Sequence, residues 1–253
     1  MLGNQEKEQQ REGSSQLSDR VPTGVPGLDA LTEGGLPSRS LIVLAGRPGA
    51  GKTLLGARFL YEGAMNDERS IYVSFAETKT QFLSNMRRFG LDFQRLMDRE
   101  IFEFVDLTTV AAEAVSDALN LVLSRVAESR AKRLVLDSFT AIAQAFEKMI
   151  DVRIALHVIL GRLVREEGCT TLLLVEVPFG TDKIGLGIEE FVADGIIMLD
   201  SFAHKGGAFT YSEYKENERN SYQFGHEYLR NIFRWWFCGI SCHTANDSIR
   251  IWS

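Results

Sequence analysis

The sequence has few of the residues that build disulfide frameworks or metal sites. It contains 3 cysteines and 4 histidines in 253 residues, and an odd number of cysteines leaves at least one unpaired. Cys238, Cys242 and His243 lie close together, but no second pair of ligating residues follows them, so a zinc site is not expected. We therefore expect reduced thiols and a cytoplasmic protein.

Long apolar runs and an excess of positive charge are also missing. No stretch reaches the ~20 apolar residues that a transmembrane helix needs, and the N-terminus has no apolar signal core, so no membrane association is expected. The net charge is -6, which gives a polyanion such as nucleic acid no general reason to bind. With 45% hydrophobic residues, the chain can still bury a sizeable core.

The order of the predicted elements indicates one α/β domain. Residues 1–20 are rich in Gln, Glu, Ser and Gly, and we expect a flexible tail there. Between residues 21 and 207, short apolar runs alternate with helical patterns, which predicts a mostly parallel central sheet flanked by helices. Strands are expected at 41–45, 71–75, 101–105, 134–136, 170–175 and 195–199, and helices at 52–64, 82–89, 112–127 and 150–165.

The clearest motif follows the first of these strands. It reads Gly46-Arg47-Pro48-Gly49-Ala50-Gly51-Lys52-Thr53 and fits the P-loop pattern G-x-x-x-x-G-K-[ST], with Leu54 next in the helix. We expect these nine residues to bind ATP, because glycines let main-chain N–H groups converge on phosphates and a helix N-terminus adds its positive end. The alternative is a chance glycine-rich turn, for which the order of strand, loop and helix would be a coincidence.

Two P-loop side chains have separate expected roles. Lys52 reaches the β- and γ-phosphates in this type of loop, so we count it among the catalytic candidates. Thr53 is expected to place its hydroxyl on Mg²⁺. Both expectations follow from the motif alone and name ATP and Mg²⁺ as the ligands.

Three carboxylates end or follow other predicted strands. Asp137 ends the apolar segment 133–136 in the manner of a Walker B strand, and we expect it to hold Mg²⁺ with Thr53. Glu77 follows the second strand and is the candidate that orients or deprotonates the attacking water; a surface Glu that caps the next helix is the alternative. Glu176 ends another strand and is an open candidate for sensing the γ-phosphate.

Taken in order, these motifs resemble the KaiC-like branch of the RecA superfamily. The matching segments are 23–29, 34–37, the P-loop, 75–78, 137–138 and 187–195. The resemblance covers about residues 21 to 200. It implies a RecA-like P-loop NTPase fold, ATP hydrolysis, and a homo-oligomer that is usually a hexameric ring with ATP at the subunit interfaces.

The chain departs from that family in two places. Ala76 takes the place of the first of two consecutive glutamates that are common there, so slow hydrolysis is expected. The family's Lys-Met-Arg-Gly-Thr signature, whose Lys and Arg act on the neighbouring subunit's ATP, is missing from residues 208–253. Both departures favour an ATP-responsive assembly or signalling module with little turnover as the alternative to an ATPase. A DNA-binding recombinase-like motor is a third hypothesis, which the acidic balance disfavours.

We interpret residues 208–253 as a segment translated in a shifted reading frame. The codons of Tyr214 to Ser221, read one nucleotide later, permit Ile-Lys-Lys-Met-Lys-Gly-Thr, and the single codon of Trp235 and Trp236 forces glycine in that frame. A diverged C-terminal extension is the alternative. Because such a tail has no selected hydrophobic period, it is not expected to pack as strands.

Overall fold

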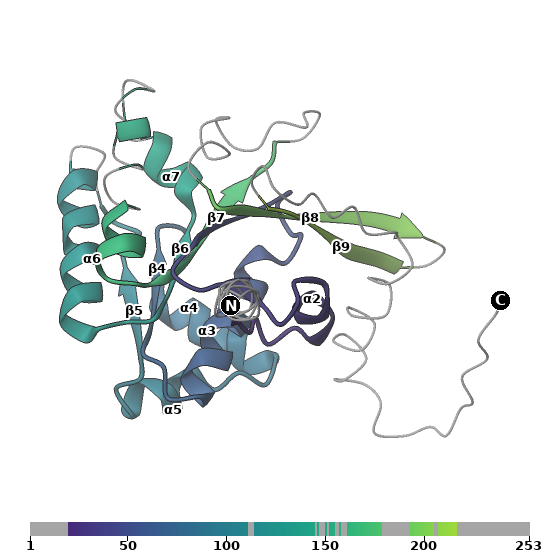
Figure 1. Cartoon of the computed structure of the whole chain (residues 1–253), viewed down its shortest axis with the longest axis horizontal. Coiled ribbons are helices and arrows are strands. Elements are labelled where there is room, and N and C mark those ends of the chain that lie inside the picture. The colour runs from purple at the N-terminus through teal and green to yellow at the C-terminus, as the bar shows by residue number, and fades with distance from the viewer. Residues whose placement is uncertain are drawn as a thin grey trace, which may run out of the picture.

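A seven-stranded, mostly parallel sheet forms the centre of the protein (Figure 1). The computed structural model describes residues 20–110, 114–144, 146, 150, 152–154, 157, 161–178, 193–204 and 207–216. The strand order is β5-β4-β6-β7-β3-β8-β9, in which every neighbouring pair is parallel except β8 and β9. The strands are β3 (Leu41–Gly46), β4 (Ser70–Ser74), β5 (Phe102–Asp106), β6 (Arg133–Asp137), β7 (Thr170–Glu176), β8 (Gly195–His204) and β9 (Gly207–Glu216).

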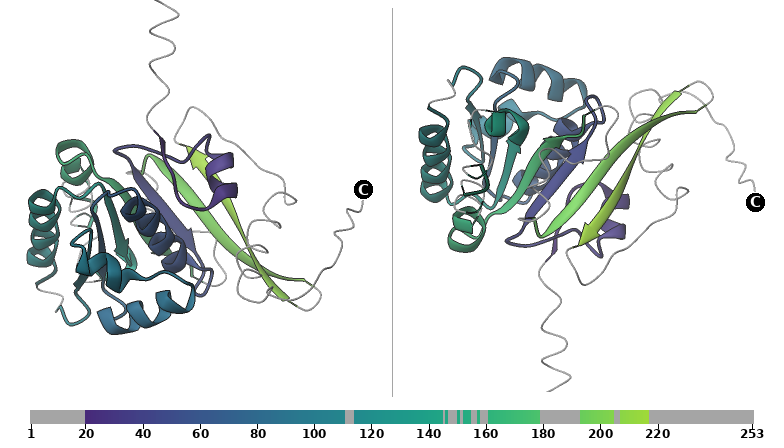
Figure 2. Two further views of the ribbon diagram at one scale, coloured as in Figure 1. Left: turned by 90° about the horizontal axis from the view of Figure 1, so that it is seen from below. Right: turned by 90° about the horizontal axis from the view of Figure 1, so that it is seen from above.

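Helices cover both faces of this sheet (Figure 2). On one face pack α2 (Pro26–Leu31), α3 (Lys52–Met65), α4 (Lys79–Arg88) and α5 (Phe93–Asp98). On the other pack α6 (Val115–Ser129), α7 (Phe139–Gln144) and the π-helical segment η2 (Arg162–Glu166). Among the described residues, no helix combines the length and apolar character that crossing a membrane requires. The predicted α/β class, a mostly parallel sheet between helices, is confirmed.

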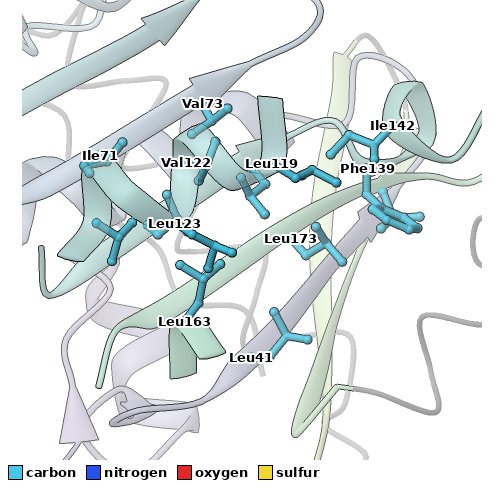
Figure 3. Packing of buried hydrophobic residues seen from close by; sticks show 14 of the residues in the cluster. Leu41, Ile71, Val73, Leu119, Val122, Leu123, Phe139, Ile142, Leu163 and Leu173 are labelled. Atoms are coloured by element: carbon cyan, nitrogen blue, oxygen red, sulfur yellow. The ribbon is translucent and has the colours of Figure 1, made fainter. Parts of the chain in front are cut away.

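The central strands are apolar on both faces because each face has its own core. Along β3, Leu41 and Val43 contribute to the cluster beneath α6, while Ile42 and Leu44 contribute to the cluster beneath α3. Figure 3 shows the first cluster, with Val122 of α6 directed toward the sheet. A fully buried aliphatic side chain contributes about 1.5–3 kcal/mol, so a continuous apolar run is what a strand covered on both faces requires.

The motif at residues 23–29 packs against α3. Asp29 Oδ1 accepts hydrogen bonds from Thr23 N and Thr23 Oγ1, at 2.7 and 2.6 Å, which closes the turn before α2. Arg58 Nε of α3 donates to Gly24 O at 2.9 Å. The two short strands β1 (Arg20–Val21) and β2 (Leu36–Pro37) pair antiparallel beside it. This motif therefore joins the start of the domain to the helix that follows the P-loop.

A buried arginine lies at the amino end of β6. Arg133 is 1% exposed; its Nε forms an ion pair with Glu68 Oε2 at 2.5 Å, and its Nη1 donates to Pro22 O and Phe59 O at 2.6 and 2.9 Å. The guanidinium also lies 4.8 Å from the centre of the Phe59 ring. Gly63 makes room for it, since a Cβ there would lie 2.3 Å from Arg133 Nε. Arg133 thus connects β6, α3 and the N-terminal segment.

The predicted elements agree closely with the observed ones. Five of the six predicted strands lie within one residue of their predicted bounds at either end, and the sixth, β8, continues to His204. Helices α3, α4 and α6 correspond to predicted helices, and helix 150–165 is described only in part. The short elements α2, α5, α7, β1 and β2 were not predicted, because six residues or fewer show too little periodicity.

The expectation that the tail after residue 207 forms no paired strand is wrong for β9. This strand pairs antiparallel with β8 from Gly207 opposite His204 to Glu216 opposite Gly195. Main-chain pairing needs no selected hydrophobic face, and the Phe, Thr and Tyr residues of β9 favour extended backbone. The reading-frame interpretation itself stays a prediction, because residues 217–253 lie outside the described residues, as do 1–19.

Candidate nucleotide-binding site

The predicted site residues gather at one edge of the sheet. Gly46 ends β3, Asp137 ends β6, Glu176 ends β7, and Glu77 follows β4 by three residues. These strands are parallel, so their carboxyl ends lie on the same side. In open α/β sheets this is the edge where ligands bind.

The loop from β3 to α3 adopts a conformation that favours glycine at two positions. Gly49 has φ +81° and Gly51 has φ +92°, and a Cβ at either would meet nothing within 4 Å. Backbone conformation rather than space therefore selects glycine here. Leu55 N donates to Gly51 O at 2.9 Å, so the N–H groups of residues 52–54 precede this helical bond and are available to an anion.

The remaining loop residues divide between solvent and core. Arg47 is half-buried and Pro48 is exposed, and Ala50 N donates to Arg47 O at 3.1 Å to close the turn. Ala50 and Leu54 are buried in the cluster beneath α3. Their side chains serve packing, and of their main-chain N–H groups only that of Leu54 is available to a phosphate, since the Ala50 N–H closes the turn.

Gly46 is selected by space. A Cβ at this position would lie 2.5 Å from Leu199 O of the neighbouring strand β8, and β3 and β8 pair through these two residues. Any side chain here would force the two strands apart. The first glycine of the motif is therefore required by the sheet.

Lys52 is folded back onto the loop that precedes it. Its Nζ donates to Gly46 O at 2.9 Å and to Arg47 O at 3.1 Å, and the residue is 8% exposed. Burial lowers the pKa of Lys52, while the charges of Glu176 and Asp137 oppose this shift. The ammonium group thus lies inside the P-loop, where a polyphosphate would provide anionic acceptors.

Thr53 and Asp137 meet although they are 84 residues apart in the sequence. Thr53 Oγ1 donates to Asp137 Oδ2 at 2.8 Å, and the Tyr72 hydroxyl donates to the same oxygen at 2.5 Å. Asp137 is 7% exposed. Burial raises the pKa of Tyr72 well above its usual value, and the charge of Asp137 and the hydrogen bond to it raise it further. Tyr72 therefore keeps its proton and acts as a hydrogen-bond donor to the carboxylate of Asp137.

This pair of oxygen groups has the chemistry of a magnesium site. Mg²⁺ is bound through one or two carboxylates together with water and substrate phosphates, rather than by an all-protein cage. A hydroxyl and a carboxylate beside the phosphate-binding loop match that pattern. Among the described residues, no group of three or more His, Cys, Asp or Glu side chains gathers into a metal cluster.

The backbone of Glu77 is tied to the end of β4. Ser74 Oγ donates to Glu77 O at 2.7 Å and accepts from Glu77 N at 2.9 Å. Phe75 N donates to Asp137 O at 2.7 Å. The following helix is capped by Thr78, which forms a capping box with Gln81. The alternative that Glu77 caps this helix is therefore wrong.

The carboxylate of Glu77 has one partner. Its Oε2 accepts from Asn85 Nδ2 at 3.2 Å, while Oε1 is buried and has no hydrogen-bond partner in the described part of the chain. Burial raises the pKa of Glu77, the Asn85 bond lowers it, and the charge of Asp137 raises it. A half-buried carboxylate beside Asp137, with one oxygen that accepts no hydrogen bond from a described residue, is suited to act as a base.

Glu176 and the segment 187–195 add less to the site. Glu176 is exposed, and its main-chain N donates to Thr140 Oγ1 at 3.1 Å; its role in sensing phosphate stays a prediction. Residues 187–192 lie outside the described residues. Asp194 Oδ2 accepts from Leu41 N at 2.8 Å, and Asp194 N donates to Leu41 O at 2.8 Å. Asp194 therefore joins β8 to the beginning of β3.

Sequence analysis missed Tyr72 and Asn85. A signal existed for Tyr72, because a tyrosine in a fully buried strand needs a partner for its hydroxyl. No signal existed for Asn85, which lies on the polar side of an amphipathic helix like many surface residues.

Comparison with known proteins places the chain in a family. The family model described as "ATPase: KaiC" matches residues 21–214. The chain belongs to the KaiC ATPase family. Membership supports nucleotide binding and ATPase activity at the level of the family, and the match reaches into β9.

Individual KaiC-family relatives agree. The chain is 30% identical over 201 residues to the UPF0273 protein PH0284 of Pyrococcus horikoshii, which covers 73% of this chain and 79% of the relative. It is 31% identical over 189 residues to the circadian clock oscillator protein KaiC of Prochlorococcus marinus, covering 71% of this chain but only 37% of the clock protein. The chain thus spans little more than a third of that clock protein.

A solved structure has the same fold. The KaiC-like protein PH0186 of Pyrococcus horikoshii OT3 superimposes with a TM-score of 0.72 at 32% sequence identity, covering 82% of this chain and 93% of that protein. The RecA-like architecture expected from the sequence is confirmed by this similarity and by the family match.

Proposed function

We propose that this chain binds ATP with Mg²⁺ and hydrolyses it to ADP and phosphate. The observation that carries the proposal is the 2.8 Å hydrogen bond between Thr53 Oγ1 and Asp137 Oδ2. It brings the phosphate-binding loop and the carboxylate at the end of β6 to one point. In a P-loop NTPase these two groups together would hold the metal ion that neutralises charge at the phosphates.

The loop and Lys52 bind the phosphates. The main-chain N–H groups of residues 52–54, which precede the first helical hydrogen bond of α3, donate to phosphate oxygens at the positive end of that helix. Lys52 exchanges its bonds to Gly46 O and Arg47 O for charged phosphate oxygens, which are stronger acceptors. Thr53 and Asp137 would hold Mg²⁺, which supplies charge neutralisation at the phosphates.

Glu77 acts on the attacking water. Its carboxylate accepts the proton as the water oxygen bonds to the γ-phosphorus and the bond to the bridging oxygen breaks. ADP leaves with the electron pair of that bond. Hydrogen bonds from Ser74 keep the Glu77 backbone fixed relative to Asp137.

Calorimetry with Mg·ATP tests the binding step. Lys52→Ala is expected to weaken affinity about a hundredfold, because hydrogen bonds to charged groups are worth ~1.5–3 kcal/mol. Lys132→Ala is the matched control, since Lys132 is exposed at the opposite end of β6. Equal affinities of the two variants would overturn the proposal.

A phosphate-release assay tests the chemical step. Glu77→Gln keeps the shape of the side chain and removes the base, so turnover should fall about 10²–10⁴-fold. ATP affinity should stay within a factor of about two, because the substitution removes no contact that binds ATP in the ground state. Unchanged phosphate release in Glu77→Gln would show that another group activates the water.

We further propose a homo-oligomer, with a hexameric ring and ATP at the subunit interfaces as the expected form. Family membership supports this. Ala76, which is exposed beside Glu77, favours a second candidate function in which nucleotide controls assembly and turnover is incidental. Light scattering with and without Mg·ATP, beside the phosphate assay, separates the two: nucleotide-dependent oligomers with negligible release would support the second candidate.

A further inference from the structure

Glu77 is fixed by two different elements. Ser74 of β4 holds its main chain through two hydrogen bonds, at 2.7 and 2.9 Å. Asn85, eight residues further along and within α4, holds its side chain through Nδ2 at 3.2 Å. Because one Glu77 oxygen is engaged by Asn85, the orientation of the other oxygen is set as well.

Helix α4 gives Asn85 a firm base. The capping box of Thr78 and Gln81 starts the helix directly after Glu77. Phe82 and Met86, on either side of Asn85 in sequence, are 0% and 3% exposed, and the centres of the Phe82 and Tyr72 rings are 4.5 Å apart. Since the Tyr72 hydroxyl binds Asp137, the helix carrying Asn85 is packed directly on the residue that holds the metal carboxylate.

We propose that Asn85 is a positioning residue that orients the Glu77 carboxylate for the attacking water. The inference rests on the proposed hydrolysis and names a residue that acts through Glu77. An amide is suited to this role, because its N–H groups favour the ionised carboxylate while the amide itself cannot take up the proton.

The hydrogen bond from Asn85 acts against the burial and the negative charge that surround the Glu77 carboxylate. Asp137 of β6 faces the carboxyl group as a like charge, and the buried Tyr72 of β4 lies close enough to sense the charge of Glu77. Glu77 forms no ion pair with any of the described residues. Asn85 therefore provides the side-chain hydrogen bond that offsets burial and repulsion.

Substitution of Asn85 tests the proposal. Asn85→Leu should lower kcat about tenfold to a hundredfold with KM for ATP unchanged, because a small misplacement of a catalytic group can cost ~10²-fold. Asn85→Asp, which loses the donor and adds a like charge, should lose at least as much. Asn85→Gln keeps the amide and should recover part of the rate. Ser84→Ala, exposed on the same helix, is the control.

A double-mutant cycle separates positioning from simple structural support. In the Glu77→Gln background, Asn85→Leu should cause no further loss of kcat, because its effect passes through Glu77. Multiplicative losses in the double variant, or a change in KM instead of kcat, would overturn the proposal.

A second measurement decides the question without turnover. In nucleotide-free protein with ¹³C-labelled glutamate carboxyl groups, the Glu77 signal, assigned with Glu77→Gln, should titrate at higher pH in Asn85→Leu than in wild type and Ser84→Ala. An unchanged titration midpoint would refute the role of Asn85. If the wild type released no phosphate while Asn85→Leu still shifted the titration midpoint of Glu77, the proposed hydrolysis would be refuted. The interaction between Asn85 and Glu77 would stand.

Discussion

The two ends of strand β6 carry buried charges with different kinds of partner. At the amino end, Arg133 is 1% exposed and has a carboxylate partner, two carbonyl acceptors and an aromatic ring. At the carboxyl end, Asp137 is 7% exposed and receives two hydroxyl groups, while no described residue forms an ion pair with it. The first charge is paired within the fold, whereas the second receives hydrogen bonds from two neutral hydroxyl groups and senses the charge of Lys52 without forming an ion pair with it.

This difference teaches how to separate a structural charge from a functional one within a single strand. A buried ion that is fully partnered holds elements together, and its removal leaves uncompensated groups behind. A buried carboxylate that has only neutral donors is held in place but not neutralised, which suits a metal ligand. Four predictions test this comparison.

The largest expected effect is on stability at the Arg133 end. Arg133→Leu leaves Glu68 without its partner and two carbonyls without donors, so the free energy of unfolding should fall by about 3–5 kcal/mol. Urea denaturation measures this, with Lys132→Leu at the exposed neighbouring position as control. A loss no larger than that of the control would remove the distinction between the two ends.

Asp137→Asn should have little effect on stability and a large effect on the magnesium dependence of ATP binding. The amide keeps an acceptor for Thr53 and Tyr72, so the free energy of unfolding should change by less than about 1 kcal/mol. The Mg²⁺ concentration that supports half-maximal ATP binding should rise about tenfold to a hundredfold, as for other losses at a metal centre. A magnesium titration at fixed ATP measures it; strong destabilisation with normal magnesium dependence would contradict the assignment.

Gly63→Ala tests the space that Arg133 occupies. Alanine normally stabilises a helix relative to glycine, but here its Cβ would lie 2.3 Å from Arg133 Nε, so overpacking should destabilise the protein by about 1–3 kcal/mol. Gly161→Ala is the matched control, since a Cβ there meets nothing within 4 Å, and it should be neutral or stabilising. Equal thermal midpoints for the two variants would show that the guanidinium moves aside easily.

The smallest effect concerns the incompletely partnered charge of Glu77. In the folded state, burial is the main cause that raises the pKa of the Glu77 carboxyl group above its ordinary value of 4.5. When this carboxyl group is ionised at higher pH, its charge therefore lowers the stability of the folded state. Glu77→Gln removes that charge and should therefore raise stability at pH 7.5. The gain should disappear below pH 4.5, where the carboxyl group is neutral in both states. Urea unfolding at both pH values checks the sign; a variant less stable at pH 7.5 would contradict it.

Much of the fold could be predicted because its strands are buried on both faces. Runs such as those of β3 and β7 are continuous and apolar, and glycines mark the turns after them. The P-loop and Asp137 were identified because local patterns place them at strand ends. Short helices such as α5 were missed, since one and a half turns carry no clear period. The pairing of β9 was missed because main-chain hydrogen bonds do not depend on a readable pattern.

The supporting residues of the site could not be predicted for a different reason. Tyr72 and Asn85 act through side-chain contacts that cross between elements, at sequence distances of 65 and 8 residues. Nothing in the local sequence states that a helical asparagine will face a glutamate. Such contacts depend on how α4 packs against β4, which only the tertiary structure specifies.

The close approach of Leu199 O to Gly46 has a consequence for protein engineering. If residues 46–53 alone were transplanted into another scaffold, the strand β8 that makes glycine necessary at position 46 would not be transferred with them. The recipient scaffold would accept alanine at the position of Gly46 unless a neighbouring strand places a carbonyl group as close to it as Leu199 O is here. The familiar pattern G-x-x-x-x-G-K-[ST] therefore mixes two kinds of requirement in this chain, one imposed by architecture at its first letter and one by backbone shape at its later glycine.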